Sequence, residues 1–193
     1  MGDPLRELLE AIAAGDDERA ETAAQEVGRL GEKALPTLRE MLNSADRDRR
    51  WWAVRALAAL GTKEAVAALI GALDDPDPDV RACAVVGLAG LQPEEAVEPL
   101  VAHLSDPSAY VARLVADGLA RFGPTAVPAL IAALKEGDVV ARAGAARALS
   151  AIQPEEAIEA LCRALDDPSA IVSYYAEDAL EKMGVGLILF PPR

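Results

Sequence analysis

The amino-acid sequence predicts an all-α protein assembled from repeated helical hairpins. A unit of 30 or 31 residues recurs along the chain, and each copy carries two apolar stripes with helical spacing. Hydrophobic residues make up 52% of the chain but aromatic residues only 4%, as suits a core of Ala, Leu and Val between closely stacked helices. One hairpin cannot bury both of its stripes, so we expect the units to stack and share one elongated core.

The stretch from Thr62 to Gln92 defines the unit. Its first half has apolar residues at i, i+3, i+4 and i+7, namely Val66, Leu69, Ile70 and Leu73. Its second half repeats this logic with Val80, Ala84, Gly87, Leu88 and Leu91. Asp75-Pro76 interrupts the chain between the halves, and Asp77 or Asp79 is available to cap the second helix.

Near-copies of this unit occupy almost the whole chain. Leu73 is equivalent to Ile12, Leu42, Leu104, Leu134 and Leu165. Leu88 is equivalent to Val27, Leu57, Leu119, Leu149 and Leu180. The sequence therefore predicts one domain over residues 1–193, with repeats at 4–31, 32–61, 62–92, 93–123, 124–153 and 154–184, followed by an apolar C-terminal tail at 185–193.

The ends of the repeats carry their own signal. Gly31, Gly61, Gly123 and Gly184 stand where a left-handed helix terminator is needed, and Gln92 and Gln153 take that place in two repeats. The segments Gln92-Pro-Glu-Glu-Ala and Gln153-Pro-Glu-Glu-Ala are identical and two periods apart. The prolines and glutamates of these segments therefore indicate helix starts rather than paired catalytic carboxylates.

The segment from Val80 to Leu88 follows the pattern Val-Arg-x-x-Ala-x-x-x-Leu. With Asp-Pro in the preceding turn, it resembles HEAT repeats, in particular the short kind named after phycobilisome lyases, over roughly residues 4–184. The resemblance implies a right-handed α-solenoid, a superhelix of about six stacked hairpins whose second helices line a concave groove. It also implies an arginine ladder at Arg50, Arg81 and Arg142, interrupted at Ala20, Ala112 and Ser173.

The groove arc of the second helices holds every Trp and Tyr of the chain. Aromatic and Arg side chains dominate protein-binding surfaces, so this arc predicts a partner site. Its predicted partner-binding residues are Trp51, Trp52, Arg55, Tyr110, Arg113, Leu114, Arg147, Tyr174 and Tyr175. The alternative for some of these rings is that they pack between neighbouring second helices, or are covered by a terminal segment or by a second copy of the protein.

Charge and composition narrow the classes of partner. The net charge of −13 disfavours binding to nucleic acid, because the phosphate backbone would be repelled. No apolar run is long enough to span a membrane, and the N-terminus lacks the pattern of a secretory signal. Cys83 and Cys162 are too few for a disulfide framework, so we expect a cytoplasmic protein.

The sequence lacks the residue groupings of a catalytic centre. His103 is the single histidine, so the several His-Glu pairs of the HEAT-like deoxyhypusine hydroxylases cannot form. We expect no catalytic residue, no metal site and no cofactor. Cys83 lies in the arc, where a small apolar spacer is a more economical interpretation than a reactive thiol.

Three functional hypotheses follow. The first is a noncatalytic scaffold or adaptor that binds a protein or peptide in the aromatic groove. The second is an auxiliary subunit of a lyase or chaperone resembling the phycobilin lyases, which would hold a chromophore-like ligand. The third is self-association through the apolar tail, whose other expected role is a lid over the last repeat.

Overall fold

The computed structural model describes residues 3–185. Every regular element in that range is a helix, which confirms the predicted all-α hairpin-repeat fold. The chain divides into two compact units, Met1–Ala96 and Val97–Arg193, called here the N-terminal and C-terminal units. The prediction of one domain over residues 1–193 stays a prediction, and the predicted tail lies outside the described residues from Gly186 onward.

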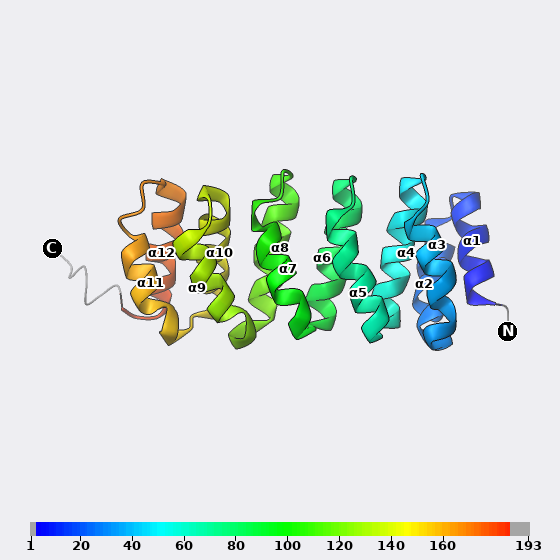
Figure 1. Cartoon of the computed structure of the whole chain (residues 1–193), viewed down its shortest axis with the longest axis horizontal. Helices are drawn as coiled ribbons and strands as arrows, with labels where there is room; N and C mark the ends of the chain where they lie inside the picture. The colour runs from blue at the N-terminus through cyan, green and yellow to red at the C-terminus, as the bar shows by residue number, and fades with distance from the viewer. Residues whose placement is uncertain (1–2, 186–193) are drawn as a thin grey trace. The chain divides into compact units, whose positions relative to one another are not determined.

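The N-terminal unit contains three helix pairs (Figure 1). They are α1 (Pro4–Ala14) with α2 (Asp17–Val27), α3 (Leu35–Leu42) with α4 (Arg47–Leu60), and α5 (Lys63–Gly71) with α6 (Pro78–Leu91). Short 3-10 helices lie at η1 (Gly28–Ala34), η2 (Ala72–Asp74) and η3 (Glu94–Ala96). The second helices α2, α4 and α6 pack against one another in succession.

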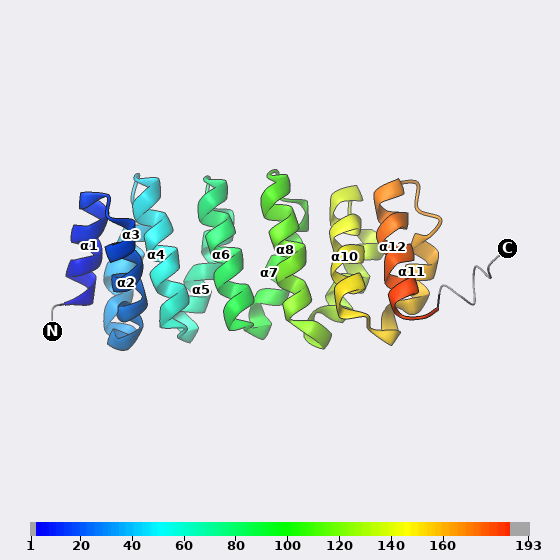
Figure 2. The same ribbon diagram turned by 180° about the vertical axis from the view of Figure 1, so that it is seen from behind.

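The C-terminal unit repeats this plan. Its pairs are α7 (Val97–Ala102) with α8 (Ala109–Arg121), α9 (Val127–Glu136) with α10 (Val139–Ile152), and α11 (Ile158–Ala164) with α12 (Ala170–Lys182). Short 3-10 helices lie at η4 (His103–Ser105), η5 (Gly123–Ala126) and η6 (Glu155–Ala157). Within this unit α7, α9 and α11 form one layer, and α8, α10 and α12 lie side by side in the other (Figures 1 and 2).

The core lies between the two layers of each unit and consists mainly of Leu, Val and Ala. Leu88 and its five predicted equivalents are at most 1% exposed, which confirms this position as the centre of the repeat. The position of Leu73 is buried in Leu73, Leu104 and Leu134, but Ile12, Leu42 and Leu165 are only half-buried.

The predicted caps and terminators form as expected. Asp77 caps α6 by accepting a hydrogen bond from the Asp79 amide at 2.9 Å. Gln92 and Gln153 end α6 and α10 with φ of 53° and 57°, and Gly61 ends α4 with φ of 61°. These left-handed residues turn the chain from the end of one repeat into the first helix of the next.

Two arginines of the predicted ladder, Arg50 and Arg142, join consecutive repeats as staples. The third, Arg81, donates from Nη1 to the Asp75 carbonyl of its own turn at 2.9 Å. Arg50 of α4 forms a bidentate ion pair with Asp75, 2.8 Å from Nε to Oδ2 and 3.0 Å from Nη2 to Oδ1. Its Nη1 donates to the Ser44 carbonyl at 3.1 Å. Arg142 makes the equivalent pair with Asp167, at 2.7 and 3.1 Å, and that contact lowers the pKa of the Asp167 carboxyl. Arg50 and Arg142 thus each join their own interhelical turn to the next one.

Replacing Arg50 with alanine should lower the free energy of unfolding by about 2–3 kcal/mol, because the Asp75 carboxylate is only 8% exposed and would keep the Asp77 amide but lose its cationic partner. Equilibrium urea unfolding followed by circular dichroism measures the change. Arg47→Ala is the matched control, since Arg47 is 54% exposed and its ion pairs lie at the surface. Equal unfolding midpoints for the two variants would contradict the staple.

Two glycines of the N-terminal unit should respond oppositely to alanine. Gly61→Ala should destabilise the protein by about 1–2 kcal/mol, because φ is 61° and the new Cβ would lie 3.2 Å from Leu91 Cδ2. Gly71→Ala should stabilise it by up to about 1 kcal/mol, because Gly71 is helical and its Cβ would meet no atom within 4 Å. Shifts of the same sign in thermal unfolding would disprove this pairing.

Candidate interaction surface

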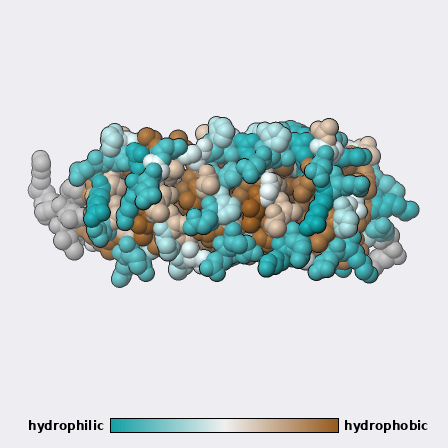
Figure 3. Space-filling view, in the orientation of Figure 1, coloured by the Kyte–Doolittle hydropathy of each residue, from teal (hydrophilic) through white to brown (hydrophobic). Residues whose placement is uncertain are grey.

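In each unit the solvent side of the second helices is called here the second-helix face. Of the predicted partner residues, those accessible on it are Trp51, Tyr110, Arg113, Leu114 and Tyr174, whereas Trp52 is buried. Figure 2 shows α4 and α6 as neighbours in the N-terminal unit, and α8, α10 and α12 as neighbours in the C-terminal unit. The opposite layer, over the first helices, is a mixed surface in which hydrophilic side chains separate small apolar areas (Figure 3).

The two tryptophans of α4 have different environments. Trp51 is half-buried, whereas Trp52 is 7% exposed and belongs to the core. Their ring centroids are 4.8 Å apart with an interplanar angle of 87°, so Trp52 supports Trp51 edge to face. Of the two rings, Trp51 is therefore the one that offers contact area to a partner.

Arg55 of α4 is engaged with the preceding helix. Its Nε lies 3.0 Å from Oε2 of Glu21 on α2, and its Nη2 contacts the other oxygen of the same carboxylate. Both side chains are about one third exposed. This ion pair joins two repeats, so the main role of Arg55 is structural.

The groove arc of α6 carries small apolar residues. Ala82 is 6% exposed, however, and so lies in the core, while Val86 is 55% exposed. Cys83 is half-buried, and burial raises the pKa of its thiol to about 12, with nearby Arg55 offsetting only part of that effect. A protonated thiol is a poor nucleophile, which fits the spacer interpretation.

In the C-terminal unit the face presents two widely exposed tyrosines. Tyr110 of α8 is 55% exposed and Tyr174 of α12 is 59% exposed. Arg113 is exposed and Leu114 half-buried, one turn after Tyr110 on the same helix. Tyr174 rests against Tyr175, with ring centroids 5.3 Å apart and an interplanar angle of 67°.

Arg147 of α10 ties the three second helices of this unit together. Its Nε donates to Oδ1 of Asp117 on α8 at 2.8 Å, and its Nη1 donates to the Tyr175 hydroxyl on α12 at 3.1 Å. The guanidinium carbon also lies 5.8 Å from the Tyr175 ring centroid. The Asp117 bond, then the Tyr175 bond, raises the pKa of Arg147. The main role of Arg147 and Tyr175 is therefore to hold the neighbouring second helices in place, and contact with a partner is secondary.

A second bridge in this unit was not foreseen from the sequence. Ser150 of α10 donates to Asp178 of α12, and Lys182 Nζ contacts Asp178 at 2.6 Å and Ser150 at 3.0 Å. Lys182, followed by Ser150, lowers the pKa of the Asp178 carboxyl. The i,i+4 spacing of Asp178 and Lys182 was a visible signal, but the role of Ser150 depends on how α10 and α12 meet.

The first turns of α8, α10 and α12 form a further exposed apolar row, called here the first-turn row. Its residues are Ala109, Tyr110, Val139, Val140, Ala170 and Ile171, all of them exposed. Tyr110, Val140 and Ile171 are repeat equivalents and are 55%, 51% and 46% exposed. Val139 was not among the residues predicted for the groove, although aligning the repeats places it next to Val140 in the first turn of α10.

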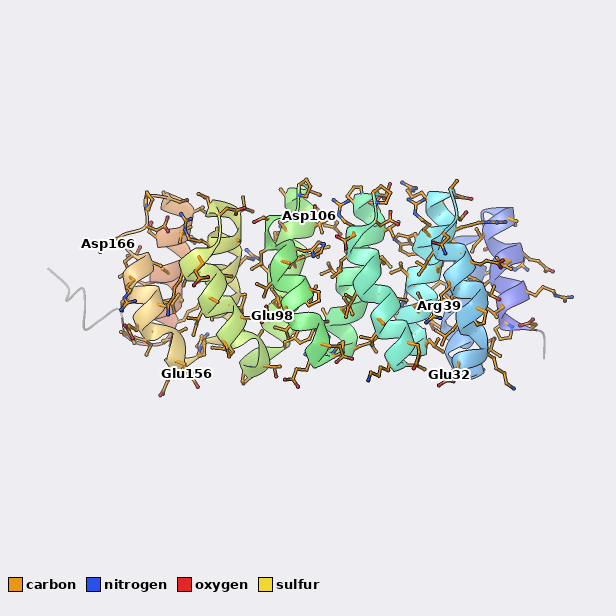
Figure 4. All side chains as sticks on the ribbon, viewed as in Figure 1. Glu32, Arg39, Glu98, Asp106, Glu156 and Asp166 are labelled. Carbon is orange, nitrogen blue, oxygen red and sulfur yellow. The ribbon has the colours of Figure 1, made fainter. Side chains whose placement is uncertain are left out.

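The single histidine has a structural partner. Nδ1 of His103 donates to the Pro99 carbonyl at 2.8 Å. Figure 4 shows Glu98 and Glu156 on different repeats and Asp106 and Asp166 in separate turns. Within residues 3–185 no group of three or more His, Cys, Asp or Glu side chains is arranged to hold a metal ion. Across the same residues, no helix combines the length and apolar character that crossing a membrane requires.

Comparison with solved structures finds other helical-repeat proteins. An engineered protein is 25% identical with a TM-score of 0.49, covering 96% of this chain and 98% of that chain. A designed armadillo repeat protein in complex with the peptide (KR)4 is 19% identical with a TM-score of 0.49, covering 95% and 100%. The complex of CpcE and CpcF of phycocyanin lyase from Nostoc sp. PCC7120 gives 21% and 0.44, covering 93% and 85%.

No curated protein sequence matches this one. The sequence profile of HEAT repeats, in contrast, matches residues 5–89, 68–124 and 97–181, which together span nearly all of the repeats. This coverage agrees with the stacked helix pairs and with the arginine staples between their turns. The chain belongs to the HEAT repeat family.

Proposed function

We propose that this protein is a noncatalytic scaffold that binds a segment of another protein on its second-helix face. The observation that carries the proposal is the exposure of Tyr110 and Tyr174, each more than half accessible on a face where solvated helices ordinarily carry charge. Large rings with few rotatable bonds give contact area at low entropic cost, which favours a protein partner.

We divide the nine predicted residues by role according to their exposure and their bonds to neighbouring helices. Trp51, Tyr110, Arg113, Leu114 and Tyr174 present accessible surface, and we assign them to partner contact. Trp52, Arg55, Arg147 and Tyr175 are buried or bonded to neighbouring helices, and we assign them to holding the contact residues in place. Because the arginines on the face are largely paired and the net charge is −13, nucleic acid is a poor fit.

A Tyr110→Ala/Tyr174→Ala variant should stay folded and lose partner affinity by at least about tenfold, since exposed rings contribute little to stability but much to binding. Affinity capture from the source organism's lysate, followed by titration of the captured protein, measures both effects. Val86→Ala is the matched control, because Val86 is equally exposed on α6.

A partner retained equally by wild type and the double variant would overturn the assignment of these tyrosines. Trp52→Ala provides a contrast, since removing this core ring should cost about 3–5 kcal/mol of stability instead of a surface contact. If no protein is captured but a linear tetrapyrrole binds saturably, the result would favour the ligand-holding subunit hypothesis.

Cys83 should label slowly with iodoacetamide at pH 8. With a pKa of about 12, only about one thiol in ten thousand is ionised at that pH. Mass spectrometry of the labelled protein should show rapid Cys83 modification only after unfolding in urea. Rapid labelling of the native protein would instead indicate an activated thiol and would support a catalytic role for Cys83.

A further inference from the structure

The first-turn row differs sharply between the two units. In the C-terminal unit the row is uncharged on all three second helices, from Tyr110 through Val140 to Ile171. In the N-terminal unit the equivalent residues are Glu18, Asp48 and Asp79, which are also exposed. Acidic residues suit a helix first turn, so their replacement by exposed apolar side chains in three consecutive repeats needs another explanation.

The three main side chains of the row have a regular spacing. Helices α8, α10 and α12 pack side by side, and packed helices lie about 8–10 Å apart. A chain in the polyproline II conformation rises about 3.1 Å per residue and returns a side chain to the same side every third residue, about 9 Å on. An extended segment with an apolar side chain at every third position would therefore match the row.

The chain contains one segment of this chemistry outside the described residues. Residues 186–193 read Gly-Leu-Ile-Leu-Phe-Pro-Pro-Arg, with Leu187 and Phe190 three positions apart and no charge before Arg193. Two prolines follow Phe190 in the sequence, and proline is compatible with a polyproline II conformation. The uncharged segment matches the uncharged row, since neither would bury an unpaired charge on contact.

We infer that the segment Leu187–Phe190 of a second copy of this chain binds across the first-turn row of the C-terminal unit. The inference rests on the proposed use of the second-helix face for binding, and it names one occupant of that face. Leu187 and Phe190 would cover neighbouring anchors among Tyr110, Val140 and Ile171. The contact would remove aliphatic and aromatic surface from water on both copies.

The reach of the chain favours a second copy over the same molecule. The Val185 amide bonds to the Leu180 carbonyl at 2.9 Å, which holds Val185 beside the last turn of α12. Ile171 lies nine residues before Leu180 on α12, so the row begins about 14 Å from the end that holds Val185. Leu187 can extend only about 7 Å from Val185. Leu187 and Phe190 can therefore occupy the row together only when they come from another molecule.

This contact is heterologous, because the segment of one copy meets the row of the next. Each molecule keeps one free segment and one free row, so assembly continues with rising concentration unless a ring closes. Both partners carry a net charge of −13 and repel each other. Added salt should therefore strengthen the association, the opposite of its effect on an ion-paired contact.

Two full-length variants test this arrangement. The segment variant carries Leu187→Asp/Phe190→Asp, and the row variant carries Val140→Asp/Ile171→Asp, where a first-turn aspartate suits the helix. In sedimentation velocity from micromolar to millimolar concentration, wild type should form growing assemblies and each variant alone should stay monomeric. An equimolar mixture of the two should stop at a heterodimer, because one intact segment then meets one intact row. Val86→Asp is the matched control and should assemble like wild type.

A wild type that stays monomeric throughout would overturn the inference, as would variants that assemble like wild type or a mixture that forms no heterodimer. These failures are separable from failure of the proposed function. If wild type is monomeric while the Tyr110→Ala/Tyr174→Ala variant still loses a captured partner, only the self-association falls. If assembly occurs as expected and no foreign partner is captured, the face serves copies of this chain.

Discussion

The fold depends on one constraint, that a single helix pair cannot cover its own apolar stripes. Leu88 and its equivalents in the other five repeats are almost completely buried because second helices pack against second helices within each unit. The staples Arg50–Asp75 and Arg142–Asp167 operate between the same neighbours, at the level of the turns. Apolar contact provides the stacking, and the bidentate pairs fix its register.

The repeat period made most of the fold predictable. Once Leu73 and Leu88 were aligned with their equivalents, the helix pairs and left-handed terminators followed from local chemistry. The arginine ladder was expected because the sequence resembles HEAT repeats. The exposure of residues on the second-helix face was harder to predict from the sequence. A helical wheel with 100° per residue places Trp51 and Trp52 on one arc, but their burial depends on a small rotation of α4. The bonds of Arg55 and Arg147 depend on Glu21 and Asp117, which lie in the preceding repeat. A search for opposite charges one period apart would have found Arg147 and Asp117, which are 30 residues apart, but Arg55 and Glu21 are 34 residues apart, about one helical turn more than a period.

The second-helix faces of the two units differ in the chemistry of their exposed residues. In the N-terminal unit the first turns are acidic and the aromatic contribution comes from one supported ring, Trp51. In the C-terminal unit the first turns are apolar, and the side chains of Tyr110 and Tyr174 are more than half exposed. The net charge of −13 does not extend to the first-turn row of the C-terminal unit, whose residues are all uncharged and exposed.

Arg147 has a consequence for the thermodynamics of recognition. By bonding Asp117 and the Tyr175 hydroxyl at once, it restricts the Tyr175 ring, and that ring in turn abuts Tyr174. A side chain already confined before an encounter has less rotamer freedom to surrender when a partner arrives. Binding at Tyr174 would then begin from a rigid platform, and its entropy cost would fall mainly on the incoming chain.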